Sequence, residues 1–244
     1  VFRIGFRAGL LRNNKSVLIV SQDNLSATLP PALYVVAMPI GQRSDLAPRA
    51  VEVLSRVDVI LAEDTRVSRQ ILKSVGIFTR MISFNSHSEA GKTEKVIQSL
   101  EKGKSLALIS DAGTPAISDP GSFVVRRVIE YGYSVIPVPG PCALTAALSV
   151  SGFPSAPTHF FGFLPTKSSA RDHELETALA CVGTLIIYEA PHRIVDLAKR
   201  LDAKAVGRSV LFARELTKTH EQLIRSTAGQ CENWFIDNPD GPGF

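Results

Sequence analysis

The sequence has few cysteines and no long apolar run. Only three cysteines, Cys142, Cys181 and Cys231, occur in 244 residues, and they lie far apart without a CxxC pair. This arrangement excludes a disulfide scaffold and a structural zinc site, and it fits a reducing compartment. No apolar stretch approaches the roughly 18 residues that a membrane-spanning helix needs. We therefore expect a soluble protein with no membrane span and no bound metal.

Several common cofactor and catalytic signatures are also missing. The chain has no GxGxxG, no GxxxxGK[ST], no HExxH and no GxSxG. Their absence argues against Rossmann-type dinucleotide binding, P-loop nucleotide binding, zinc proteolysis and serine hydrolysis.

The composition is that of a globular protein with moderate charge. Hydrophobic residues make up 45% and charged residues 20% of the chain, with a formal net charge of +4 and a pI near 9.1. The small basic excess is compatible with a polyanionic partner, although many enzymes share it. At roughly 150 residues per domain, the length favours two domains.

The N-terminal segment, residues 1–30, reads as an atypical extension outside the fold. Residues 1–29 contain one acid, Asp23, and four basic residues, Arg3, Arg7, Arg12 and Lys15. This pattern is typical of an organellar transit segment or of a ragged extension, and both interpretations stay open. The expected location is the cytoplasm, with a plastid or mitochondrion as the alternative.

From residue 33 onward, short apolar runs alternate with segments of helical periodicity. Asp45 and Asp119 are expected to cap the helices that follow the first and fourth runs. Because the runs are apolar on both faces, they predict a parallel sheet with helices on each side. The strands are expected at residues 33–40, 57–62, 80–84, 105–109 and 134–138.

A stiff connector, PVPGP at residues 137–141, separates this half from the rest. We predict an N-terminal domain at residues 31–139 and a C-terminal domain at residues 140–244. In the second domain, strands are expected near residues 159–164, 184–188 and 209–212, and helices near 143–150, 172–181, 193–201 and 217–225.

Polar residues, glycines and prolines follow four of the predicted strands. Taken singly, the glycines and prolines are ordinary turn residues, and Glu63, Asp64 and Arg66 fit a surface cluster. Ligands of open parallel sheets bind beyond the carboxyl ends of the strands, so four such loops at one edge favour a site there. The loops are residues 39–42, 63–66, 110–121 and 139–143.

Seven segments, taken together, resemble a known family. They are LYVVAMPIGQ, AEDTR, LISDAGTPAISDPG, PVPGPCALTAALS, FFGFLP, YEAPHR and ARELTK. In order and spacing, they resemble the ribosomal small-subunit methyltransferase I family of the tetrapyrrole-methylase superfamily. The resemblance implies S-adenosylmethionine-dependent methylation of a cytidine ribose 2′-hydroxyl in small-subunit rRNA.

The resemblance also implies a fold and partners. The fold is the two-domain α/β tetrapyrrole-methylase (class III methyltransferase) fold, with a parallel N-terminal sheet, a mixed C-terminal sheet and the active site between the domains. The implied partners are rRNA or the assembled small subunit, and a second copy of the chain in a homodimer. The chain stops at Gly243-Phe244, about where the family's last strand begins, so an exposed sheet edge is expected.

The family's functional residues can be carried over motif by motif. The implied catalytic residues are Asp64, as base or orienter, Arg66 and Lys218. The implied cofactor contacts are Pro39, Gly41, Ser110, Asp111, Ala112, Gly113, Thr114, Pro115, Cys142, Ala143 and Tyr188. The implied substrate contacts are Glu63, Lys167, Arg171, His192, Arg193, Arg214 and Glu215.

The chain departs from the family pattern at several positions. Gln42 stands where the family has Asn, and Met38 stands where it has Thr. Residues 166–171 hold only two basic side chains, which weakens the expected grip on RNA phosphates. Two alternatives therefore stay open: a tetrapyrrole C-methyltransferase of the same fold, and a non-catalytic RNA-binding module.

Overall fold

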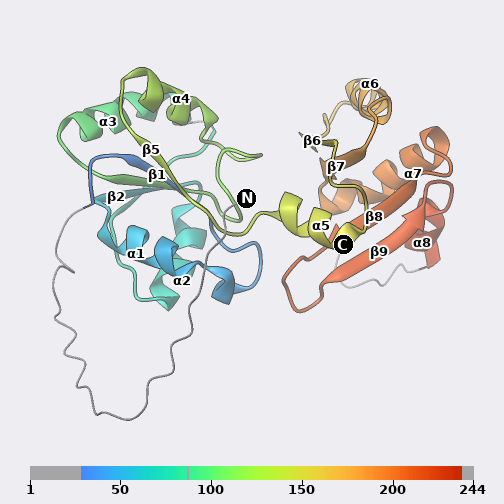
Figure 1. Ribbon diagram of the computed structural model, residues 1–244, viewed down its shortest axis with the longest axis horizontal. Helices are drawn as coiled ribbons and strands as arrows, with labels where there is room; N and C mark the ends of the chain where they lie inside the picture. The colour runs from blue at the N-terminus through green and yellow to red at the C-terminus, as the bar shows by residue number, and fades with distance from the viewer. Residues whose placement is uncertain (1–28, 87, 238–244) are drawn as a thin grey trace, which may run out of the picture.

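The computed structural model describes residues 29–86 and 88–237 of the chain. These residues form two α/β lobes joined by a connector at residues 139–142 (Figure 1). Within the described ranges, no helix is long and apolar enough to cross a membrane. Most of the N-terminal extension, for which two interpretations were open, and residues 238–244 lie outside these ranges.

The first lobe is built on a parallel sheet, as predicted. Its five strands have the order β3-β2-β4-β1-β5, and every neighbouring pair is parallel. The inner strands β1, β2 and β4 are largely buried apolar runs between polar turns, whereas β3 and β5, at the two edges of the sheet, are partly exposed. Their bounds are β1 Leu33–Val36, β2 Val59–Ala62, β3 Met81–Ser83, β4 Leu106–Ile109 and β5 Val135–Val138.

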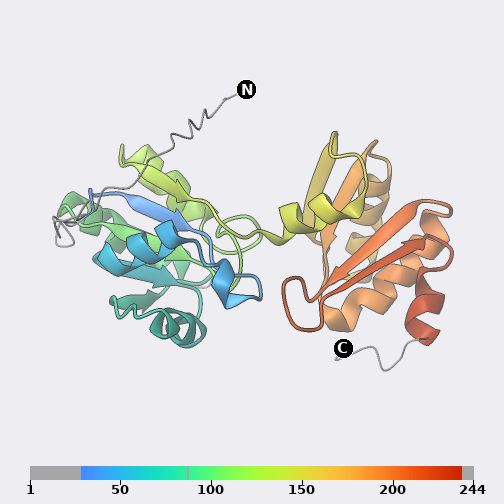
Figure 2. The same ribbon diagram turned by 60° about the horizontal axis from the view of Figure 1, so that its bottom comes forward.

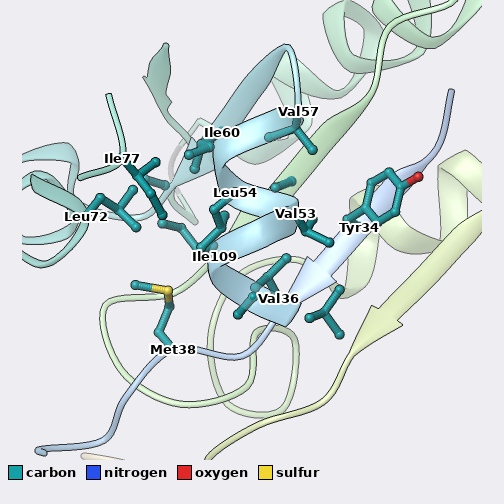
Figure 3. Close-up of a cluster of buried hydrophobic side chains, with 14 of the residues drawn as sticks. Tyr34, Val36, Met38, Val53, Leu54, Val57, Ile60, Leu72, Ile77 and Ile109 are labelled. Atoms are coloured by element: carbon teal, nitrogen blue, oxygen red, sulfur yellow. The ribbon is translucent and has the colours of Figure 1, made fainter. Parts of the chain in front are cut away.

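Helices cover both faces of this sheet (Figure 1). In β4, Ala107 and Ile109 face one core, while Leu106 and Leu108 face the other. The first core also contains residues of α1 and α2, and Figure 3 shows α1 side chains against those of β1. The second contains residues of α3 and α4. The helices are α1 Pro48–Arg56, α2 Thr65–Ser74, α3 Glu89–Glu101 and α4 Ser122–Glu130.

Two predicted helix caps are wrong. Asp45 lies in the short 3-10 helix Arg43–Asp45, and the residue before α1 is Ala47, so Pro48 alone supplies the predicted helix start. Helix α4 begins two residues later than expected, because Gly121 takes a φ of +135° at its N-terminal boundary. Asp119 therefore does not cap α4 and lies in the loop after β4.

The second lobe contains both strand directions, in two separate pairs. β6 runs parallel to β7, and β8 runs antiparallel to β9. The strands are β6 Thr158–Phe163, β7 Thr184–Tyr188, β8 Ser209–Arg214 and β9 Gln222–Thr227. The helices are α5 Ala143–Ser151, α6 Ser168–Leu179, α7 Ile194–Lys204 and α8 Cys231–Asp237, with a short 3-10 helix at Pro191–Arg193.

The helix predicted at residues 217–225 is wrong. Residues 222–227 form β9, which pairs with β8 from Arg214↔Gln222 to Ser209↔Thr227. Pairing along six residues outweighs the weak helical preference of a short segment. The residues between the strands make a turn instead.

A cavity of about 690 Å³ separates the two strand pairs. Residues of β7, such as Leu185 and Ile187, line one side, and residues of β8, such as Val210 and Leu211, line the other.

Candidate functional site

The topology of the first sheet defines one crevice. β1 and β4 are neighbours, yet α1, which follows β1, and α4, which follows β4, pack on opposite faces. Such a reversal opens a crevice at the carboxyl ends of the two strands. The turn after β1 and the loop after β4 border it, which is the edge that the sequence predicts.

Backbone pairing holds these two turns together. The Met38 amide donates to the Gly113 carbonyl over 2.8 Å, and the Gly113 amide donates back to Met38 over 3.1 Å. The buried Ser110 donates its hydroxyl to the Ala112 carbonyl at 3.2 Å, which closes the loop. The Thr114 hydroxyl donates to the Pro141 carbonyl at 3.1 Å. The β4 loop is therefore bound both to the β1 turn and to the connector before α5.

Carboxylates gather where β2 and β4 end. The Asp64 amide donates to Asp111 Oδ1 at 3.1 Å, and the Asp111 backbone lies near enough to the Glu63 carboxylate to influence its pKa. Burial raises the pKa of Glu63, and the charges of Asp119 and Asp111 raise it further. Burial also raises the pKa values of Asp111 and Asp119. The sequence analysis took Asp119 for a helix cap and therefore did not place it with Glu63 and Asp111.

Asp64 has the opposite electrostatic character. Its Oδ1 accepts from the Arg66 amide at 2.8 Å and so caps α2, and its Oδ2 lies 2.7 Å from Arg66 Nη2. These hydrogen bonds lower the pKa of Asp64 to about 2. The Arg66 side chain is 89% exposed. Asp64 is therefore a weak base that fixes Arg66 at the edge of the crevice.

Tyr188, at the end of β7, is a residue of the second lobe that lies beside the site. Its hydroxyl accepts from the Leu144 amide in the first turn of α5 at 3.0 Å. Burial raises the pKa of Tyr188 to about 12, and nearby Cys142 and Asp119 add to the effect. The predicted cofactor residues Cys142, at the end of the connector, and Ala143, the first residue of α5, thus lie beside Tyr188, which is also near the first-lobe carboxylate of Asp119.

The turn between β8 and β9 also reaches the first lobe. The Gln42 amide donates to Thr217 Oγ1 at 3.0 Å. In the same turn, Lys218 Nζ lies 3.0 Å from Glu215 Oε1. Arg214 Nη1 donates to Gln222 Oε1 at 2.9 Å where the turn leaves the strands. The sequence analysis did not single out Thr217, although it stands between two residues that it named.

The other predicted substrate residues divide into two groups. Lys167 and His192 are exposed. Arg171 is 5% exposed and is bound by Asp196 and the Pro165 carbonyl. Arg193 donates to the Leu164 carbonyl at 2.8 Å and pairs with the buried Glu189. Both guanidinium groups are engaged inside the second lobe, where they join the β6–α6 loop to α7 and its preceding turn.

Replacing Asp119 with Asn is expected to stabilise the fold at neutral pH. Burial raises the pKa of Asp119, so its carboxylate opposes folding above that raised pKa and ceases to do so once protonated. The unfolding midpoint should rise by about 2–4 °C, as for roughly 1 kcal/mol in a chain of this size. The gain should disappear toward about pH 4, near the ordinary carboxyl pKa. Thermal melts at both pH values measure this, and a gain that does not depend on pH would contradict it.

The amino-acid sequence of this chain is similar to those of known proteins along most of its length. The family Tetrapyrrole (Corrin/Porphyrin) Methylases matches residues 32–232. The ribosomal RNA small subunit methyltransferase I of Vibrio cholerae is 43% identical over 209 residues, which cover 85% of this chain and 73% of the relative. The protein of the same name from Mesorhizobium japonicum is 44% identical over 227 residues, covering 91% and 77%.

A solved structure shares the fold at low sequence identity. The uroporphyrin-III C-methyltransferase from Thermus thermophilus, crystallised with S-adenosylhomocysteine, superimposes with a TM-score of 0.57 and 17% identity. The superposition covers 83% of this chain and 91% of that one. The fold class predicted from the sequence is confirmed.

Proposed function

The chain belongs to the ribosomal RNA small subunit methyltransferase I family of the tetrapyrrole methylases, and from this we propose that it methylates small-subunit rRNA. It is a methyltransferase that uses S-adenosylmethionine. The acceptor we propose is the 2′-hydroxyl of a cytidine ribose, in free rRNA or in the assembled subunit. We further propose that the enzyme works as a homodimer.

The cluster of three carboxylates at the ends of β2 and β4 fits a cationic methyl donor. Glu63, Asp111 and Asp119 lie partly buried at one edge of the sheet, and burial raises the pKa of each. Desolvated carboxylates gain free energy from a positive charge beside them. A sulfonium ion supplies such a charge without offering a proton, which suits a site that must keep its carboxylates ionised.

The turns around the crevice supply the remaining donor contacts in this proposal. Pro39 and Gly41 border it from β1, and the loop of Ser110, Asp111, Ala112, Gly113, Thr114 and Pro115 borders it from β4. Cys142, Ala143 and Tyr188 close it from the connector and the second lobe. What supports this assignment is the backbone pairing of Met38 with Gly113, since it joins two of the three segments.

S-adenosylmethionine supplies a methyl group on sulfur that a nucleophilic oxygen can take. The chain's own residues must place that oxygen and remove its proton. In this proposal the Glu63 carboxylate accepts the proton of the acceptor hydroxyl, because its raised pKa makes it a better base than Asp64 at neutral pH. Asp64 holds Arg66, whose exposed guanidinium binds an RNA phosphate.

Lys218 and Arg214 supply further positive charge from the second lobe. Lys218 is exposed and is held by Glu215 in the β8–β9 turn, beside the β1 turn that borders the crevice. Lys167 and His192 are exposed elsewhere on this lobe and contribute to phosphate binding in the proposal. Arg171 and Arg193 support these loops from inside the lobe.

Donor affinity is expected to depend on pH in a way that product affinity does not. As the pH falls through the raised pKa values of Glu63, Asp111 and Asp119, protonation removes the charge that attracts the sulfonium. The Kd of S-adenosylmethionine should rise about tenfold between about pH 8 and about pH 4, the ordinary carboxyl pKa, as for a one-unit pKa shift on binding. Isothermal titration measures it. S-adenosylhomocysteine, which lacks the sulfonium charge, is the control, and an equal rise for both would contradict the role of the carboxylates.

A transfer assay tests the function directly. The protein is incubated with labelled S-adenosylmethionine and, in separate arms, small ribosomal subunits, free small-subunit rRNA and uroporphyrinogen III. Label in RNA, mapped to one cytidine whose ribose resists alkaline cleavage, is expected. Label in a base or in the tetrapyrrole would contradict the proposed acceptor.

A further inference from the structure

The turn between β8 and β9 crosses from the second lobe to the first. Figures 1 and 2 show it reaching toward the segment that follows β1. The hydrogen bond from the Gln42 amide to Thr217 Oγ1, 3.0 Å long, lies at this crossing. It joins residues 175 positions apart in the chain.

The backbones approach closely at this contact. A Cβ atom added to Gly41 would lie 2.5 Å from Lys218 Cγ, 2.7 Å from Thr217 Oγ1 and 2.8 Å from the Leu216 carbonyl oxygen. Only a glycine leaves room for all three atoms. The β1 turn is therefore fitted to the shape of the β8–β9 turn.

The backbone of the β8–β9 turn is strained at Thr217 and nearby. Among the described residues other than glycine, three have a positive φ, and two of these, Glu215 at 49° and Thr217 at 65°, are in this turn. A β-branched residue rarely adopts this conformation. The Thr217 amide donates to Glu221 Oε2 at 2.7 Å, and the Lys218 amide donates to the Glu215 carbonyl at 2.9 Å. Strain that its surroundings maintain is typical of functional sites.

The contact continues to the loop that we propose holds the donor. Gln42 follows Ile40 and Gly41, and a Cβ on Gly113 would lie 3.3 Å from Ile40 Cγ2. The same turn carries Met38, which exchanges two backbone hydrogen bonds with Gly113. A shift of the β1 turn would therefore be transmitted to the β4 loop.

We propose that Thr217 is a positioning residue for the methyl donor: its hydroxyl oxygen anchors the β1 turn through the Gln42 amide and so fixes the donor loop against the second lobe. This inference rests on the proposed function, because it takes the β1 and β4 turns as the donor site. Thr217 itself does not contact the reacting atoms.

Three variants test the proposal. Thr217→Val keeps the branched shape and removes the acceptor, and Thr217→Ser keeps the acceptor. Thr219→Val makes the same change at an exposed threonine of the same turn. For each, hydrogen–deuterium exchange of the Gln42 amide is measured without ligand, and the Kd of S-adenosylhomocysteine is measured by isothermal titration. Thermal melts establish that the variants are folded.

In Thr217→Val, the Gln42 amide should exchange about tenfold faster and S-adenosylhomocysteine should bind about tenfold more weakly, as for the loss of one hydrogen bond. Thr217→Ser and Thr219→Val should stay within about twofold of the unchanged protein in both measurements. Unchanged exchange in Thr217→Val, or equal losses in Thr217→Ser, would overturn the anchor. Unchanged affinity despite faster exchange would overturn the positioning role. If the unchanged protein bound no S-adenosylhomocysteine, the proposed function and this positioning role would fail together, while the exchange result would still decide the anchor.

Discussion

Replacing Gly41 with alanine is expected to reduce kcat/KM for RNA methylation by about 100-fold, because a displacement of about 1 Å in a catalytic arrangement has an effect of that size. The added methyl group would overlap the Leu216 carbonyl oxygen, which a side-chain rotation cannot move away. The two lobes must then move apart at this contact. Steady-state kinetics with saturating RNA and varied donor would show the effect.

Gly91→Ala is the matched control. Gly91 lies in α3, and a Cβ atom there would meet no atom within 4 Å. This variant should keep full activity and gain about 0.5–1 kcal/mol of folding free energy, since alanine is the better helix former. If Gly41→Ala retained activity within about threefold, the close approach of the lobes would not matter for catalysis.

Replacing Glu63 with Gln is expected to lower kcat by about 100-fold or more, the usual effect of removing a general base. Glutamine has nearly the shape of glutamate and keeps an acceptor oxygen near the Asp111 backbone, so the loops should stay in place. In the unchanged enzyme, kcat should fall as the pH drops through the raised pKa of Glu63. The variant should lose this dependence, which a pH profile of single-turnover rates would reveal.

Asp64→Ala separates the two neighbouring carboxylates. Because Asp64 caps α2 and holds Arg66, its loss should lower the unfolding midpoint and weaken RNA binding more than it lowers single-turnover kcat. A loss of kcat as large as that of Glu63→Gln, with the acid limb of the pH profile abolished, would instead assign the base to Asp64.

The sequence predicts the first lobe well because local and tertiary signals agree there. Runs such as Leu106–Ile109 are apolar at every position, as is typical of a strand buried on both faces. Strands alternate with helices along this lobe and run parallel, so the turns after β1, β2 and β4 lie at one edge of the sheet. The residues of the β1, β4 and connector turns named from the sequence do lie together, because the fold forces the turns to meet.

The parts that could not be predicted depend on contacts between distant segments. β9 reads as a helix until it is paired with β8, and Thr217 gains importance only through Gln42, far away in the chain. Arg171 reads as a cation free for RNA, whereas a carboxylate of α7 engages it inside the lobe. Asp119 satisfies the rule for a helix cap, but the positive φ of Gly121 moves the helix start past it.

A crystal structure with S-adenosylhomocysteine tests the central assignment most directly. The account predicts the ligand in the crevice between the ends of β1 and β4, in contact with the turns at Pro39–Gly41 and Ser110–Pro115 and with Tyr188 closing the second-lobe side. Density for the ligand in the cavity between β7 and β8, with the β1 and β4 turns untouched, would contradict it.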